Sequence, residues 1–171
     1  LNVALAQRVQ ELSRYRSDFF GRLREILGDR PDIRIVGDRF VFQSEVLFAT
    51  GSDEINDLGH GELDKLAGAV NELLKAIPED IQWVLQVNGH TDKRPITGTG
   101  GRFKSNWDLS AARAIAVVRY LADTGIPPAH LAAAGFGELY VMGDASSDAS
   151  WRFNSSPFRD TTEITRRLVR R

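Results

Sequence analysis

Apolar residues at alternating steps of three and four predict three helices, since such positions gather on one face of a helix with 3.6 residues per turn. The predicted helices cover residues 1–28, 55–77 and 105–124. Each of them ends at or next to a glycine or a proline, and both residue types stop helices. Ser105 and Asp108 have the spacing of a capping box, which marks the start of the third helix.

Shorter apolar runs predict strands over residues 33–36, 39–42, 81–87 and 131–136. The Gly-Asp pair between the first two strands predicts a tight turn and therefore a hairpin. The third strand is apolar enough for a central place in a sheet. The order strand, helix, strand, helix, strand indicates a two-layer α/β or α+β sandwich with its helices on one face of the sheet.

Three further segments have weaker patterns. Residues 46–48 are apolar, and we expect them to extend the sheet. Residues 143–157 are rich in Ser, Asp and Ala and predict a loop or a frayed turn. Residues 161–171 fit either a last strand or a short helix.

A repeat of seven residues runs through the amino-terminal helix. Its apolar positions are Leu5, Val9, Leu12, Phe19, Leu23 and Ile26, with Arg16 in the one gap. Such a repeat is typical of a short parallel coiled coil, in which a charged core residue sets the register. An amphipathic helix packed on its own domain has the same pattern. We therefore divide the chain into residues 1–30, an amphipathic helix or coiled-coil stalk, and residues 31–171, a folded domain.

Composition narrows the class of protein. With 42% hydrophobic and 26% charged residues among 171, the chain is expected to form a folded core. The formal net charge of −1 gives no general attraction to nucleic acid. Cysteine is absent, which excludes disulfides and thiolate metal sites, and no run of eighteen apolar residues predicts a membrane span. Because Leu1 is not an initiator methionine, we expect a fragment or a processed chain.

The most informative chemistry is a pair of opposite charges. Asp92 is the first charged residue after the third predicted strand, and Arg113 lies at the border of the apolar stripe of the next helix. A guanidinium binds a carboxylate with two parallel hydrogen bonds, and a carboxylate accepts hydrogen bonds from an ammonium. A ligand that carries both groups would satisfy both side chains, with Asn106 and Thr91 adding polar groups nearby. Alternatively, Asp92 and Arg113 form a structural salt bridge with each other.

Two motifs around this pair carry a family resemblance. The chain has Gly89-His90-Thr91-Asp92, then a loop, then Asn106, Leu109, Ser110, Arg113 and Ala114 at the spacing Asn-x-x-Leu-Ser-x-x-Arg-Ala. This arrangement resembles the OmpA-like peptidoglycan-binding domain, and Ser105 to Ser110 resembles the MotB-like branch. The resemblance implies that Asp92 binds the amino group of peptidoglycan diaminopimelate and that Arg113 binds its carboxylate, with Asn106 and Thr91 lining the site.

The resemblance also implies a fold and a setting. The fold is an OmpA-like two-layer sandwich, α+β, with a β-α-β-α-β core and a mixed sheet, here with an amino-terminal helical extension. The implied parent protein is a homodimer anchored in the inner membrane, with this part in the periplasm and a MotA-like or TolQ-like membrane partner. Residues 153–158 depart from the family pattern, which usually has Asn-Arg-Arg before its last strand.

The expected activity is therefore non-covalent binding without catalysis, and no cofactor or nucleic acid is expected. The three histidines lack a zinc spacing, and no nucleophile stands at a recognisable distance from one. Two alternatives remain open. One is a scaffold or dimerisation module with a vestigial pocket, and the other is a cell-wall hydrolase that acts through Asp92 and His90.

Overall fold

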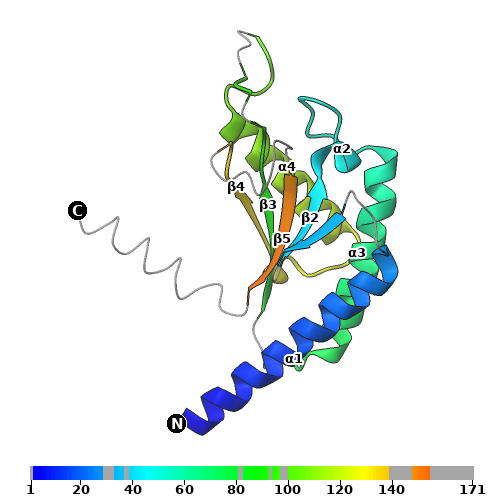
Figure 1. Cartoon of the computed structure of the whole chain (residues 1–171), viewed down its shortest axis with the longest axis vertical. Coiled ribbons are helices and arrows are strands. Elements are labelled where there is room, and N and C mark those ends of the chain that lie inside the picture. Colours follow the sequence, from blue (N-terminus) through cyan, green and yellow to red (C-terminus); the bar gives the residue numbers. More distant parts are fainter. Residues whose placement is uncertain are drawn as a thin grey trace, which may run out of the picture.

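The computed structural model describes residues 2–28, 33–36, 39–80, 83–92, 94–96, 100–138 and 148–154, and Figure 1 traces them. A mixed sheet forms the centre of the molecule. Its strands are β1 (Ile33–Val36), β2 (Arg39–Gln43), β3 (Val84–Gly89), β4 (Leu131–Gly135) and β5 (Asp148–Asn154). They lie in the order β1-β2-β5-β3-β4. Only β3 and β4 pair in parallel among these strands, with Leu85 opposite Leu131 and Gly89 opposite Gly135.

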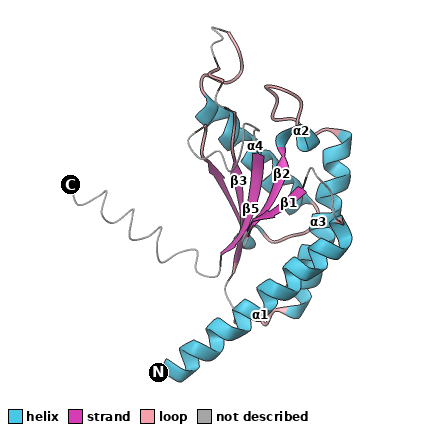
Figure 2. Cartoon of the chain, in the orientation of Figure 1, coloured by secondary structure: helices cyan, strands magenta, loops and turns pink. Residues whose placement is uncertain are grey.

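The helices are α1 (Asn2–Leu27), α2 (Ser44–Leu47), α3 (Asp57–Ala76) and α4 (Asn106–Asp123), with a 3₁₀ turn, η1, over Pro128–His130. Figure 2 shows the helical layer beside the strands. The core joins both layers: Phe40 and Phe42 of β2 and Leu85 and Val87 of β3 are buried in one cluster with apolar side chains of α1, α3 and α4. Alternate strand residues point to one face, so this cluster defines the covered face of the sheet.

Helix α4 is the crossover between the parallel strands β3 and β4, a connection that such a pair requires. Two glycines bring its backbone against the strand ends. A Cβ atom on Gly89 would lie 2.0 Å from the carbonyl oxygen of Ser110, and one on Gly135 would lie 2.7 Å from the amide nitrogen of Ala111. This close backbone approach fixes the first turns of α4 beside the ends of β3 and β4.

Three sequence-based predictions need correction. The loop predicted within 143–157 is wrong at residues 148–154, because these residues form β5 and pair with both β2 and β3. Residues 46–48 do not extend the sheet, since α2 ends at Leu47 and Phe48 forms a single bridge with Ile55. The strand predicted at 81–87 is observed from Val84 to Gly89. The prediction for residues 161–171 lies outside the described residues.

Helix α1 has two unlike halves. Near its carboxyl end, Phe19 and Leu23 are buried in the core, and the helix contacts α3. Near its amino end, Val3, Leu5 and Val9 are 72%, 66% and 59% exposed. The carboxyl half therefore packs on the domain, as one interpretation of the heptad pattern expected, while the amino half leaves apolar side chains uncovered. Within the described part of the chain, no helix combines the length and apolar character needed to cross a bilayer.

Candidate ligand-binding site

The turn after β3 (residues 90–92 and 94–96) carries Asp92. The turn begins alongside β4, because the Phe136 amide donates to the Gly89 carbonyl at 2.9 Å and the Thr91 amide donates to the Gly137 carbonyl at 3.0 Å. The His90 ring is buried and stacks on Phe136, with the ring centres 5.2 Å apart. These contacts extend the β3–β4 pairing by two residues and place Asp92 where the chain leaves the sheet.

Asp92 itself is held loosely. Its Oδ1 accepts a hydrogen bond from the Arg94 amide at 3.1 Å, and its Oδ2 lies 3.8 Å from the Arg94 Nε. The side chains of Asp92 and Arg94 are 41% and 92% exposed. An exposed ion pair of this length contributes little to stability, so a ligand cation can replace Arg94 at small cost.

Asn106 fixes the turn from the first residue of α4. Its side chain is buried, and its Nδ2 donates to the Arg94 carbonyl at 3.0 Å and to the Asp92 carbonyl at 3.4 Å. The sequence places Asn106 in the site as a polar group for a ligand. The structure shows that its amide donates to the backbone of the turn, so Asn106 positions Asp92.

The predicted start of α4 is confirmed, with a difference in the second capping bond. Ser105 is the N-cap, and its side chain accepts from the Asp108 amide at 3.2 Å. In a capping box the acidic residue would reach back to the N-cap amide. Here the Asp108 Oδ2 accepts from the Lys104 amide instead, at 3.1 Å, so the cap also orders the residue before the helix.

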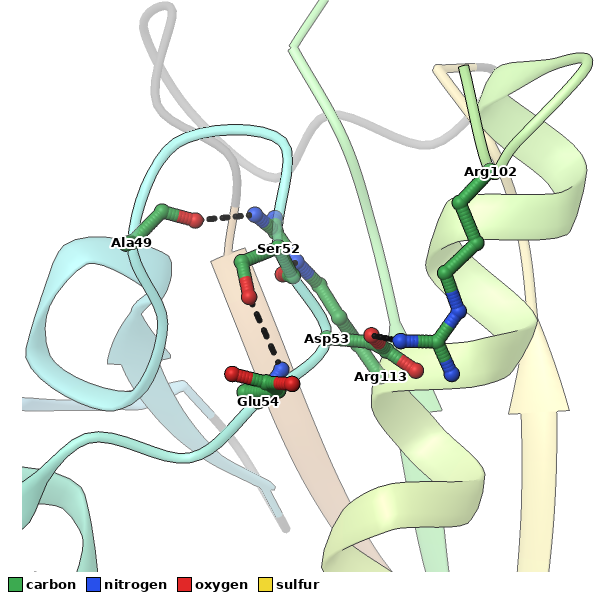
Figure 3. A network of polar contacts seen from close by, with 6 residues as sticks. All are labelled: Ala49, Ser52, Asp53, Glu54, Arg102 and Arg113. Carbon is green, nitrogen blue, oxygen red and sulfur yellow. Dashed lines mark hydrogen bonds and ion pairs between the residues drawn. The ribbon is translucent and has the colours of Figure 1, made fainter. Parts of the chain in front are cut away.

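Arg113 crosses from α4 to the loop after α2 (residues 48–56), as Figure 3 shows. The residue is 6% exposed. Its Nε donates to the Ser52 carbonyl at 2.8 Å and its Nη2 to the Ala49 carbonyl at 3.2 Å. The guanidinium carbon lies 5.1 Å from the centre of the Phe48 ring, within the range of a cation–π contact. Arg113 therefore anchors the loop after α2 to α4.

Burial and charge act on Arg113 in opposite directions. Desolvation lowers the pKa of its guanidinium, because burial disfavours the charged form, whereas the negative charges of Glu45, Asp92 and Asp53 raise it. The net effect lowers the pKa of Arg113 from the ordinary value of an arginine, and a guanidinium still stays protonated at neutral pH. The charge of Asp92 thus favours the cationic form of Arg113.

The described contacts of Asp92 and Arg113 involve other groups. The described partner of the Asp92 carboxylate is Arg94, and the described hydrogen-bond partners of the Arg113 guanidinium are backbone carbonyls. Thr91 joins the turn through the Gly137 carbonyl and Asn106 through the Asp92 carbonyl. Thr91, Asp92 and Asn106 thus meet where β3 ends and α4 begins, while the Arg113 guanidinium reaches the loop after α2.

A second ion pair links the loop after α2 to the segment before α4 (residues 100–105). The Nη1 of Arg102 lies 2.8 Å from the Oδ1 of Asp53, and these side chains are 68% and 13% exposed. Sequence reasoning missed Phe48, Ser52, Asp53 and Arg102. No periodicity or motif relates positions 48–53 to positions 102 and 113, so only the folded chain shows that they meet.

Two hydroxyl groups near the site differ in their bonding. The Ser110 Oγ donates to the Trp107 carbonyl and accepts from the Gly137 amide, both at 3.0 Å, which explains its burial without a role as nucleophile. The Thr91 Oγ1 is buried and has no hydrogen-bond partner among the residues that the structure describes. Buried polar groups almost always have partners. Among the same residues, no group of three His, Asp or Glu side chains is arranged to hold a metal ion.

Comparison with known sequences identifies relatives of part of the chain. The Bacillus subtilis protein YtxE is 35% identical over 115 residues, which is 67% of this chain and 43% of the relative. Outer membrane protein A of Serratia odorifera is 36% identical over 106 residues, which is 62% of this chain and 39% of the relative. The chain thus spans less than half the length of these two relatives.

Several solved structures have the same fold. A MotB-like protein from Desulfovibrio vulgaris is 26% identical, with a TM-score of 0.66 over 86% of this chain and 98% of that one. The periplasmic domain of Helicobacter pylori MotB is 21% identical, with a TM-score of 0.59 over 81% and 97%. The cell wall anchor of the type VI secretion system of Pseudomonas aeruginosa is 24% identical, with a TM-score of 0.54 over 84% and 97%.

These likenesses confirm the predicted two-layer fold, and the sequence match extends past β4 into β5. The model of the OmpA family matches residues 47–155, which include α3, β3, α4 and β4 and both sides of the Asp92–Arg113 site. Because this match covers well over half of its 171 residues, the chain belongs to the OmpA family.

Proposed function

We propose that this domain binds peptidoglycan without catalysis and anchors a membrane-associated, MotB-like protein to the cell wall. The ligand group is the diaminopimelate of the stem peptide. One observation carries the proposal: a buried arginine and a loosely held aspartate lie in one site, and each has described contacts other than the opposite charge. A zwitterion is the ligand that matches two such groups.

The roles follow from the donors and acceptors present. A guanidinium is a planar fork of five N–H donors that matches a carboxylate, and Arg113 is already fixed in place by its bonds to the loop after α2. Arg113 binds the ligand carboxylate, while Asp92 exchanges Arg94 for the ligand ammonium. The Thr91 hydroxyl, which lacks a described partner, gains one when a polar ligand group enters. Asn106 holds the turn in place.

The affinity of one site is expected to be modest. Each hydrogen bond to a charged group contributes about 1.5–3 kcal/mol. Two or three such bonds, less the loss of freedom on association, correspond to dissociation constants on the order of micromolar to millimolar. A wall polymer repeats its peptides, so a dimer would bind it much more tightly than a single domain does.

Helix α1 supports such a dimer. Its amino half exposes the apolar side chains of Leu5 and Val9, which belong to the heptad pattern, and of Val3. In Figure 1 this half projects at the opposite end of the molecule from the loop after α2. We infer that α1 pairs with a second copy and leads toward an inner-membrane segment, which leaves the site facing the wall.

The relatives support the setting. One neighbour is described as a cell wall anchor of a secretion system, and others are periplasmic domains of MotB. By analogy, this domain lies in the periplasm, and its parent works with a MotA-like or TolQ-like membrane partner.

Sedimentation with purified, diaminopimelate-containing wall sacculi tests the proposal. The wild-type domain is expected to co-sediment, and Asp92→Asn and Arg113→Lys are expected to lose at least about tenfold in affinity, since each loses part of a charge-assisted contact. Asp123→Asn and Arg119→Lys make the same changes at exposed positions of α4 and serve as matched controls.

Two results would contradict the proposal. Absence of wild-type binding excludes wall anchoring by this site. Equal binding by wild type, Asp92→Asn and Arg113→Lys would favour a scaffold with a vestigial pocket. Release of soluble wall fragments by the wild type, lost in His90→Ala, would instead indicate a hydrolase.

A further inference from the structure

The ion pair between Asp53 and Arg102 adds a second arginine to the site. Asp53 belongs to the loop that Arg113 anchors through the neighbouring Ser52 carbonyl. Arg102 comes from the segment before α4 and meets Asp53 at 2.8 Å across 49 positions of sequence. Figure 3 shows both arginines reaching the same short loop from the side of α4.

The Asp53 carboxylate therefore interacts with two arginines. Asp53 contacts Arg102 directly, and its charge also raises the pKa of the Arg113 guanidinium through space. A carboxylate whose side chain is 13% exposed needs a cation near it, since a buried charge without a partner is strongly unfavourable. Arg102 thus adds a second positive charge to a region in which the carboxylates of Glu45, Asp92 and Asp53 already act on Arg113.

Arg102 is placed to present that charge to a ligand. Only the contact of its Nη1 with Asp53 is described among its polar side-chain contacts, and 68% of the side chain is exposed. Its guanidinium carbon lies 5.4 Å from the centre of the neighbouring Phe103 ring, which together with Asp53 limits where the head of the side chain goes. An arginine held in this way loses less freedom when it binds an anion than an unrestrained one.

From these contacts we propose that Arg102 is a specificity-determining residue that binds a second carboxylate of the peptide ligand. The inference rests on the proposed function, in which Arg113 binds the first carboxylate and Asp92 the ammonium. Asp53 is the positioning residue that holds Arg102 beside Arg113. The preferred ligand class is then a diaminopimelate-containing peptide with an additional free carboxylate next to the diaminopimelate residue, in preference to one in which that carboxylate is amidated.

Calorimetric titration of the whole domain with two synthetic peptides tests this assignment. The peptides contain diaminopimelate and differ in one neighbouring carboxylate, which is free in one and amidated in the other. The wild type is expected to bind the free form about three- to tenfold more tightly, the range for a charged hydrogen bond in a partly exposed position. Arg102→Gln should remove that preference and leave the affinity for the amidated peptide unchanged within about twofold.

Three further variants separate specificity from structure. Arg102→Lys keeps the charge and should retain part of the preference. Asp53→Asn should reduce the preference, because it releases Arg102, and its thermal unfolding shows whether it still folds. Lys104→Gln removes an exposed cation two residues further along and should leave the preference intact.

The outcomes distinguish the two proposals. Binding of both peptides without preference, a preference that survives Arg102→Gln, or an equal loss for both peptides in that variant overturns the role of Arg102 and leaves wall binding standing. Failure of the wild type to bind either peptide, together with no binding to sacculi, overturns the proposed function as well.

Discussion

The cationic and the anionic sides of the site are built in different ways. On the cationic side, Arg113 is 6% exposed and is bonded to two carbonyls and packed on an aromatic ring. On the anionic side, the Asp92 carboxylate is 41% exposed and pairs at 3.8 Å with an arginine that is itself almost fully in water. The first group is part of the scaffold, whereas the second has one hydrogen bond from the Arg94 amide and a long, exposed ion pair among its described contacts. Under the proposed function, one side of the site combines binding with stability, and the other contributes to binding with little effect on stability.

The close contact between β3 and α4 depends on Gly89. Substitution of Gly89 is therefore expected to have the largest effect on stability. In Gly89→Ala the new Cβ would lie 2.0 Å from the Ser110 carbonyl oxygen, so α4 and β3 must move apart. We expect the free energy of unfolding to fall by about 3 kcal/mol or more, measured by urea denaturation.

Gly68→Ala is the matched control for that change. Gly68 lies within α3, and a Cβ there meets nothing within 4 Å. Replacing such a helical glycine should raise the stability by about 0.5–1 kcal/mol. Equal effects of the two substitutions on stability would show that the Gly89 contact does not set the distance between α4 and β3.

Neutralising Arg113 and Asp92 in turn compares directly how much each side of the site contributes to stability. Arg113→Met leaves the Ala49 and Ser52 carbonyls without this donor, and we expect a loss of about 2–4 kcal/mol in the free energy of unfolding. Asp92→Asn should change it by less than about 0.5 kcal/mol, because its ion pair is exposed. Similar losses in both variants, measured in the same denaturant, would break the comparison.

Thr91→Val is expected to give a small gain in stability and to show where binding and stability conflict. The variant replaces a buried hydroxyl that lacks a described partner with a methyl group of similar size. The free energy of unfolding should rise by about 0.5–1 kcal/mol, whereas affinity for sacculi should fall severalfold. A fall in both quantities would show that the hydroxyl has a structural role instead.

The sequence was sufficient to predict the helices and strands that have a strong hydrophobic periodicity. The β1–β2 hairpin, α3, β3, α4 and β4 were predicted because each buries a regular stripe or an apolar run and is bounded by clear breakers. The Asp92 and Arg113 pair was found in the same way, since one follows a strand and the other lies beside a helix's apolar stripe.

Other features depend on contacts between distant residues. Strand β5 has the sequence Asp-Ala-Ser-Trp-Arg-Phe-Asn, whose polar residues are typical of a loop, yet backbone pairing with a strand on each side makes it a strand. The partners of Arg113 lie 61 and 64 positions away in sequence and are backbone carbonyls, which no residue type signals. The Asp53–Arg102 pair is equally remote from any local pattern.

The central position of β5 has a consequence for assembly of the protein during its synthesis. β5 is the last described strand to leave the ribosome, yet it separates β2 from β3. Until it emerges, the hairpin and the β3-α4-β4 unit each have an unsatisfied inner edge, which is the kind of surface that pairs with other chains. The nascent polypeptide therefore gains its full cooperativity only in a late, long-range step, and we expect slow folding and a need for chaperone protection before that step.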